Sequence, residues 1–526
     1  MRVDRRCAAS GLPYWVTFQT KRSMRDLIEL TGSLPWSKLK STAVWDTVLE
    51  PGSKMSHLFH LAQQKQAATD EEAATALYGS PKAVAKLHSL KNNLKERLLD
   101  VVFLLDYNEP GYTDRQKAHF ECNKKWATAM TLLAKNVKHT AIEQLEQVLR
   151  HTRHFEFTEL SMNALYYLRL HYGTVAGDPK KYEFYRDLYR QYQSIWMMEN
   201  EVEELYTQLI SRYIAGRAPQ EEAADQGEAY YLQIAPYLDQ CSSFRLHLSG
   251  RLLQLQACNS RGDHAKMADL CEDALRFFKA KPYESNLPLQ VFYYQLVVSC
   301  VHLRDFGRGQ DIIRRYHTIY EEGSFNWFKV QELYFLLALH TQHYDDAFDT
   351  CEKILQHADL EKQPAQIREM WKIYEAYTHL LVRARRVDRQ PTRRFKPGKF
   401  LNQTPVFSKD KRGMNIPILI AQILFGIADQ NYDTCIERVE AIGKYTSRYL
   451  KKQDNFRSNC FLKMLLQVPE AAFHREAANR KAERYLLQLR EVPIEIANQS
   501  HEIEIIPYED LWSIVLDLLP KTRFGK

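Results

Sequence analysis

Apolar residues recur at helical spacing along most of the chain, and polar or helix-breaking turns interrupt them at regular intervals. The turns centre near Val137, Asp178, Ala218, Gly262, Asp305, His343 and Asn431. Their separations lie between 38 and 44 residues, except for a final gap of 88, which equals two periods of 44. Such periods are typical of helical-hairpin repeats, in which each unit buries its apolar face against its neighbours. The pattern therefore predicts an all-α chain of stacked helical hairpins.

The best-defined hairpin has a first helix ending at residue 260, a turn at 261–263 and a second helix over 264–278. Similar units occupy 296–320, 333–355 and 418–442. Each turn has a polar residue (Asp263, Asp305, His343, Asn431), then a ring (His264, Phe306, Tyr344, Tyr432), and three residues later Met267, Gly309, Ala347 or Cys435. We expect the polar residue to cap the second helix and the ring to wedge between the two helices of its hairpin. The mostly small third residue would let the helices approach closely.

This turn, ring and small residue resemble the middle of the tetratricopeptide-repeat motif over about 120–445. The chain departs from that family because no unit has its Trp-x2-Leu-Gly opening and because the periods exceed 34 residues. The resemblance implies antiparallel helices in a right-handed superhelix with a concave binding groove. Residues 409–427 also resemble part of uncharacterised bacterial helical-repeat proteins, a likeness that implies no activity.

The same pattern predicts the organisation of the whole chain. Residues 1–23 are expected to be a disordered extension, with Met24 as an alternative translation start, and 24–118 an N-terminal helical region. Helical repeats follow over 119–382 and 415–490, separated by a basic insertion loop at 383–414. Residues 491–526 are expected to cap the solenoid, with a short strand or extended segment near 501–508 and a helix over 509–519.

An aromatic stripe marks the helix predicted after the second turn. Tyr182, Tyr185, Tyr189, Tyr192 and Trp196 are spaced by three and four residues, so they share one helix face. Packing between helices is one interpretation of this face, and a peptide groove lined by tyrosine hydroxyls is the other.

Charge singles out the insertion. Residues 383–412 contain eleven Lys or Arg and two Asp, a net +9 in a chain of net +7. Cations interleaved with rings suit an acidic partner, because guanidinium groups pair with carboxylate or phosphate and rings stack. The candidate partner-binding residues are Arg383, Arg385, Arg386, Arg389, Arg393, Arg394, Phe395, Lys396, Lys399 and Phe400. A solvated loop whose rings pack on adjacent helices is the alternative.

A second basic region lies near the N-terminus. A short helix over 70–77, a turn at 78–80 and a longer helix over 81–105 give the outline of a helix-turn-helix. The longer helix carries the candidate nucleic-acid-binding residues Lys82, Lys86, Lys91, Lys95 and Arg97. The same cations could instead form a solvated face on the first hairpin.

Motifs for catalysis or cofactors are missing. The sequence has no phosphate-binding loop, dinucleotide-binding glycine pattern, zinc-protease motif or nucleophile elbow. The pairs His57 with His60 and His151 with His154 have no evident third ligand, so we expect no metal, no cofactor and no catalytic residue. The longest apolar run, 416–428, is too short to span a bilayer. The nine scattered cysteines are typical of a reducing cytoplasm.

These observations favour a non-enzymatic scaffold or adaptor that binds a protein or peptide partner in the repeat groove. The basic insertion would add a contact for an acidic surface. The alternative is a nucleic-acid-binding regulator in which the repeats sense a ligand and residues 81–98 or 383–412 contact phosphate. Steep loss of affinity between about 50 and 200 mM salt would distinguish the alternative.

Overall fold

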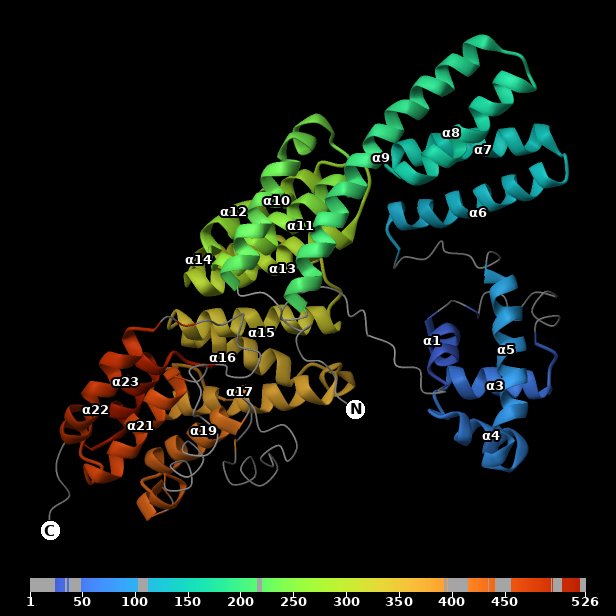
Figure 1. Ribbon diagram of the computed structural model, residues 1–526. Coiled ribbons are helices and arrows are strands. Elements are labelled where there is room, and N and C mark those ends of the chain that lie inside the picture. Colours follow the sequence, from blue (N-terminus) through green and yellow to red (C-terminus); the bar gives the residue numbers. More distant parts are fainter. Residues whose placement is uncertain are drawn as a thin grey trace.

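A computed structural model describes residues 24–33, 36, 49–102, 112–214, 220–391, 395, 415–433, 435–439, 456–492, 494 and 504–520. Within these ranges the regular structure is helical and contains no strand, which confirms the all-α prediction (Figure 1). None of the helices in the described part is long and apolar enough to cross a membrane.

Successive helices pack as antiparallel neighbours along most of the chain (Figure 1). The N-terminal helices are α1 (Arg25–Ser33), α3 (Lys54–Gln63), α4 (Asp70–Tyr78) and α5 (Val84–Asp100). The central helices are α6 (Asp114–Ala134), α7 (Lys138–His154), α8 (Thr158–Thr174), α9 (Pro179–Ile214), α10 (Gln220–Gln240), α11 (Phe244–Arg261), α12 (His264–Lys279), α13 (Asn286–Leu303), α14 (Phe306–Arg315), α15 (Phe325–His340), α16 (Tyr344–Leu355) and α17 (Ala365–Arg383). The last are α19 (Asn415–Ala428), α21 (Phe456–Glu470), α22 (Arg475–Arg490) and α23 (Tyr508–Leu518).

Five of the predicted turns share one backbone geometry. Each has a left-handed residue, with φ between 52° and 71°, followed by a residue whose N–H bonds the carbonyl five positions back. The left-handed residues are Asn136, Gly262, Arg304, Gln342 and Gln430. The bonds join the N–H groups of Val137, Asp263, Asp305, His343 and Asn431 to the carbonyls of Leu132, Cys258, Cys300, Ala338 and Gly426, at 2.8 to 3.0 Å. This is the Schellman helix ending, which satisfies carbonyls that the finished helix leaves unbonded.

The other two predicted turns are less alike. At the second turn Pro179 is the first residue of α9, and the Asp178 carboxylate accepts a bond from the Lys181 N–H at 3.1 Å. The turn near Ala218 lies outside the described residues, between α9 and α10.

Side-chain caps are described at two of the four predicted positions, and Thr434, whose N–H Asn431 would bond, lies outside the described residues. The carboxylates of Asp263 and Asp305 each accept a bond from the N–H three residues on, at 3.0 Å, and so cap α12 and α14. His343 makes no such side-chain cap for α16.

The rings that follow the capping residues contact side chains of the neighbouring hairpin. His264 stacks on His302 of α13, and Phe306 stacks on His343, each with ring centroids 3.7 Å apart. Both partners belong to the following hairpin, so the prediction that these rings wedge within their own hairpin is wrong. The ring joins one repeat to the next.

At Gly309, one of the predicted small residues, the lack of a side chain determines how closely two helices can pack. A Cβ added there would collide with the Leu337 side chain of α15. The missing side chain therefore lets α14 approach α15 of the following hairpin, whereas the prediction had placed the close approach within its own hairpin.

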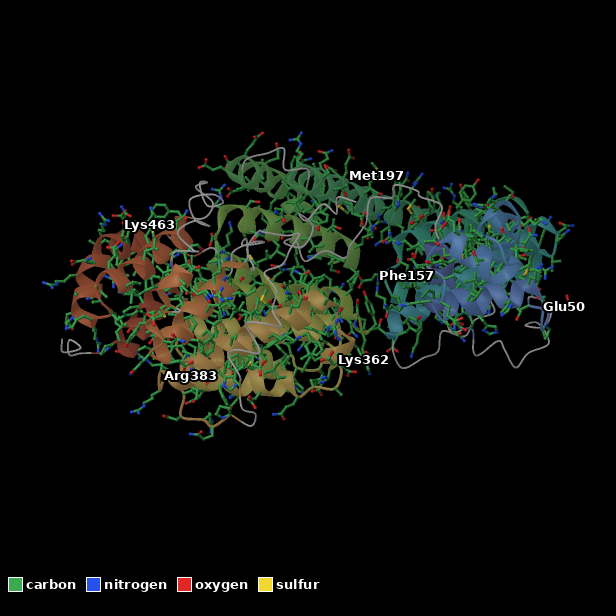
Figure 2. All side chains as sticks on the ribbon, turned by 90° about the horizontal axis from the view of Figure 1, so that it is seen from below. Glu50, Phe157, Met197, Lys362, Arg383 and Lys463 are labelled. Carbon is green, nitrogen blue, oxygen red and sulfur yellow. The ribbon has the colours of Figure 1, made fainter. Side chains whose placement is uncertain are left out.

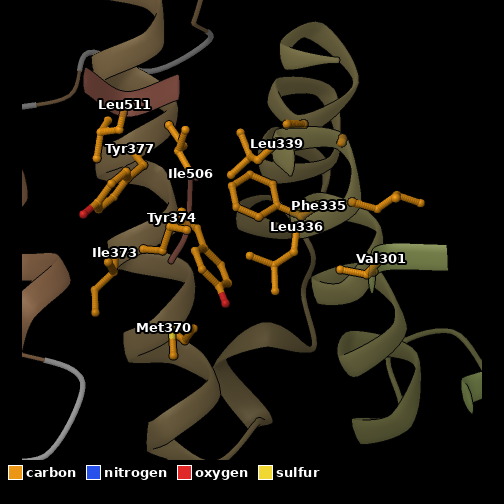
Figure 3. Close-up of a cluster of buried hydrophobic side chains, with 14 of the residues drawn as sticks. Val301, Phe335, Leu336, Leu339, Met370, Ile373, Tyr374, Tyr377, Ile506 and Leu511 are labelled. Atoms are coloured by element: carbon orange, nitrogen blue, oxygen red, sulfur yellow. The ribbon is translucent and has the colours of Figure 1, made fainter. Parts of the chain in front are cut away.

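Apolar packing divides the chain into separate clusters. A continuous core runs from Phe244 in α11 to Leu519 after α23. In it, α15 presents Phe335 and Leu336 toward Tyr374 of α17 (Figure 3). The N-terminal helices α1 to α5 bury their own cluster.

The 36-residue helix α9 belongs to two further clusters. Its first half packs against α6 to α8 through Tyr185, Tyr189 and Tyr192. Its second half packs against α10 and α11 through Val202 and Leu209. The three central tyrosines of the predicted stripe thus serve interhelical packing, whereas Tyr182 and Trp196 at its ends are exposed.

The ends of the described chain differ in detail from the sequence predictions. The basic helix α5 begins after a short 3-10 turn, Pro81–Ala83, and ends at Asp100 rather than near 105. Gly79, with φ 71°, ends α4, and the Ser80 hydroxyl accepts a bond from the Lys82 N–H. Residues 504–507 form no strand, and α23 follows them directly.

Candidate functional site

The described start of the basic insertion is bound to the rest of the fold. Arg383 is exposed at the end of α17 (Figure 2). Its side chain forms an ion pair with Asp429 after α19 and lies 5.0 Å above the Phe425 ring. Arg386 forms an ion pair with Asp517 of α23. These contacts tie α19 and α23 to the end of α17.

Two more residues of the insertion face the fold. Arg389 lies 3.4 Å from Asp349 of α16, although both side chains are 57 % exposed. Phe395 stacks between His379 and Phe425, with centroids 4.7 and 5.4 Å away. The insertion therefore begins as a structural strap across α16, α17, α19 and α23.

The remaining candidates in the insertion give no further site. Arg385 is exposed and takes a left-handed backbone conformation, with φ 57°. Arg393, Arg394, Lys396, Lys399 and Phe400 lie outside the described residues. Partner binding by this segment stays a prediction.

The basic face of α5 is partly engaged within its own cluster. Lys91 donates a 3.1 Å hydrogen bond to Asp70, a carboxylate with no exposed surface, and Lys95 lies 3.9 Å from Asp26. Lys82, Lys86 and Arg97 are exposed. Four of the five cations thus lie on α5 and Lys82 lies in the 3-10 turn before it, and the bond to Asp70 gives Lys91 a structural role.

A different region has the shape of a binding site. A cleft of about 570 Å³ opens where α13, α14, α15 and α16 meet, and we call it the α14–α16 cleft. Its lining residues are Tyr293, Gln310, Ile313, Arg314, Tyr316, His317, Tyr320, Glu322, Trp327, Val330, Gln331, Tyr334, Asp346, Asp349, Thr350 and Lys353. The volume is within the range of clefts that hold small ligands or peptide side chains.

Aromatic side chains form the floor of the α14–α16 cleft. Tyr293 contacts both Tyr316 and Tyr320, with ring centroids 5.6 and 5.8 Å apart, and all three are largely buried. The Tyr320 hydroxyl donates to the Gln290 carbonyl at 2.6 Å. Trp327, only 6 % exposed, starts the α15 wall. Packed rings give a rigid apolar surface of the kind that anchors partner side chains.

A polar network fixes one wall of the cleft. Gln310 of α14 donates to the Tyr334 hydroxyl at 3.1 Å, and Tyr334 of α15 donates to an Asp346 carboxylate oxygen at 3.3 Å. Gln310 also reaches that oxygen at 3.4 Å. Three helices are therefore joined by one set of bonds.

Burial keeps the tyrosines of the cleft neutral. Burial raises the pKa of Tyr334, and the nearby Asp346 carboxylate raises it further, against a lowering by the Gln310 bond. Burial likewise raises the pKa of Tyr293 and of Tyr320. The phenols are therefore hydrogen-bond donors across the physiological pH range.

Across the described ranges, no group of three or more His, Cys, Asp or Glu side chains could hold a metal ion. The His57 and His60 pair and the His151 and His154 pair are included in that range.

Sequence reasoning did not find the α14–α16 cleft. A local signal existed, because Tyr316, Tyr320 and Trp327 crowd a connection between two hairpins, a place where turns are normally polar. The rest of the lining comes from helices up to 60 residues apart, from Tyr293 to Lys353, and only stacking brings them together.

Protein-family models, curated proteins and solved structures were all compared with this chain, and none matches.

Proposed function

We propose that this chain is a non-enzymatic cytoplasmic scaffold that binds a protein or peptide partner in the α14–α16 cleft of a helical-repeat solenoid. The observation that carries the proposal is the cleft itself, an aromatic floor between two successive hairpins with polar groups on both walls. Aromatic anchors in a preformed, concave site are where binding energy concentrates in protein interfaces.

The solenoid part of the proposal rests on repetition. The hairpin turns share the Schellman ending at Gly262, Arg304 and Gln342. The stacked pairs His264 with His302 and Phe306 with His343 join consecutive hairpins. Repeated turns and repeated contacts between neighbours are what a tetratricopeptide-like superhelix requires.

The cytoplasmic part rests on cysteine chemistry. The described cysteines are free thiols and most are buried, and burial raises the pKa of the Cys300 thiol to about 12. Such thiols are unreactive packing groups, in keeping with a reducing compartment.

Peptide display tests the binding function. A random dodecapeptide library on phage is panned on the immobilised full-length protein, and enriched peptides are synthesised and titrated by fluorescence polarisation. Gln331→Trp places a bulky ring in the cleft from the α15 wall, whereas Gln193→Trp places the same ring on an exposed part of α9. We expect at least tenfold weaker binding for Gln331→Trp and unchanged binding for Gln193→Trp. Failure to enrich any peptide, or equal affinities for both variants, would refute the proposal.

A further inference from the structure

Two cations in the α14–α16 cleft lack a carboxylate partner. Arg314 of α14 and Lys353 of α16 are exposed and line the cleft, and neither forms an ion pair with any residue that the structure describes. The Lys353 ammonium lies 5.1 Å from the Trp327 ring centre, a cation–π contact that holds it near the aromatic floor.

The carboxylates of the cleft, in contrast, have partners within the chain. Asp346 accepts the bonds from Gln310 and Tyr334, and Asp349 pairs with Arg389. Glu322 lies 3.9 Å from His357, a pair that is charged only when the imidazole is protonated. Asp346 keeps its negative charge, because Gln310 and Tyr334 are neutral donors. An incoming anion would therefore bind at Arg314 and Lys353, which have no carboxylate partner among the described residues, and away from Asp346.

The two cations stand on different helices with apolar surface between them. α15 packs against both α14 and α16 and presents Trp327 and Val330 to the cleft. A ligand that reaches both cations must therefore cross the apolar wall. An extended peptide with side chains of both kinds fits this requirement, since alternate positions along a chain can carry charge and apolar bulk.

From this arrangement we infer that the partner segment is acidic. Resting on the function proposed above, the inference assigns the cleft a segment with carboxylate side chains held by Arg314 and Lys353, and an aromatic or aliphatic side chain on the Trp327 wall. Charge-assisted bonds from both walls would fix the segment's register, and the buried rings would supply affinity.

Charge reversal with neighbouring controls tests the inference. The probes are the enriched peptides, N-terminally acetylated and C-terminally amidated so that side chains supply the only carboxylates. Arg314→Glu is compared with Arg315→Glu, the next residue of α14, which is exposed but does not line the cleft. Lys353→Glu is compared with Lys372→Glu on α17, also exposed and outside the cleft.

We expect the enriched peptides to be rich in Asp and Glu and to bind at least tenfold more weakly to Arg314→Glu and Lys353→Glu. The two control variants should bind as the unchanged protein does, and affinity should fall as salt screens the charges. Peptides that are neutral or basic, or that tolerate both cleft variants while remaining sensitive to Gln331→Trp, would overturn the acidic assignment and leave the binding function standing. Absence of any enriched peptide would overturn both.

Discussion

At the scale of single residues, Gly309 shows how one position sets the distance between helices. Its absent side chain leaves room for Leu337, whereas Gly307 on the same helix has open space, with the nearest atom 4.0 Å from an added Cβ. We expect Gly309→Ala to destabilise the α14–α15 contact by about 1–3 kcal/mol, because overpacking forces a neighbouring side chain to move. Hydrogen exchange of the α14 and α15 amides measures the change.

Gly307→Ala is the matched control for that substitution. An alanine side chain meets open space at Gly307, so Gly307→Ala should stabilise α14 by at most about 0.5–1 kcal/mol, the helix-interior value for this substitution. Equal protection in the two variants would show that Leu337 does not limit the approach.

At the scale of elements, α23 is held to the repeats by a buried cation. Arg457 of α21 bonds Glu504 at 2.6 Å and Glu509 at 2.7 Å, and it also donates to two backbone carbonyls. Glu504 is only 2 % exposed. Removing one partner of such a pair leaves a buried charge, so Arg457→Ala should lower the opening free energy of α23 by about 3–5 kcal/mol. Hydrogen exchange of the α23 amides measures it.

Arg475→Ala gives the comparison for α23. Arg475 pairs with Asp517 at 3.0 Å in a more exposed setting, and exposed pairs contribute about 1 kcal/mol or less. If both substitutions loosen α23 equally, the buried pair is not its anchor.

Elements were also where sequence prediction worked best. The turns at Gly262, Asp305 and His343 could be placed because polar or helix-breaking residues interrupt the apolar pattern there, which is a local feature of the sequence. The stacking partners of His264 and Phe306 could not be predicted, because each partner lies on the next hairpin, almost 40 residues away, and leaves no local pattern in the sequence. The all-α class could thus be predicted from the sequence. The α14–α16 cleft could not, because its walls come together only when successive hairpins stack.

At the scale of the whole molecule, the half-buried His302 and the buried His340 make stability depend on pH. Burial, aided by the charges of His264 and His340, lowers the pKa of His302 to about 3. Burial and two arginines lower the pKa of His340 to about 4, against a raising bond to the Glu504 carbonyl. The unfolded chain takes up these protons near pH 6.5, so stability should fall as pH drops from about 6.5 toward 4.

His302→Phe tests this pH dependence, because phenylalanine can keep the stack on His264 without titrating. Between pH 6.5 and 4 the variant should lose less stability than the unchanged protein, by up to about 1.4 kcal/mol per pH unit for one proton. Urea unfolding midpoints measure the two slopes. His139→Phe, at a side chain that is 89 % exposed, should leave the slope as it was. Parallel slopes for His302→Phe and the unchanged protein would contradict the assignment.

Helix α9 packs into two apolar clusters, and its helical geometry fixes the angle between the two stripes of side chains that it presents to them. Each residue turns a helix by about 100° and advances it by about 1.5 Å. Loss of one residue between Tyr192 and Met198 would therefore rotate the stripe that meets α10 and α11 a quarter-turn or more away from them. Changes of seven or eleven residues would leave the two stripes within about 20° of their present relation. The number of residues between the two stripes of α9 therefore sets the orientation of one cluster relative to the other. An insertion or deletion in α9 preserves this orientation only when its length is close to a whole number of helical turns.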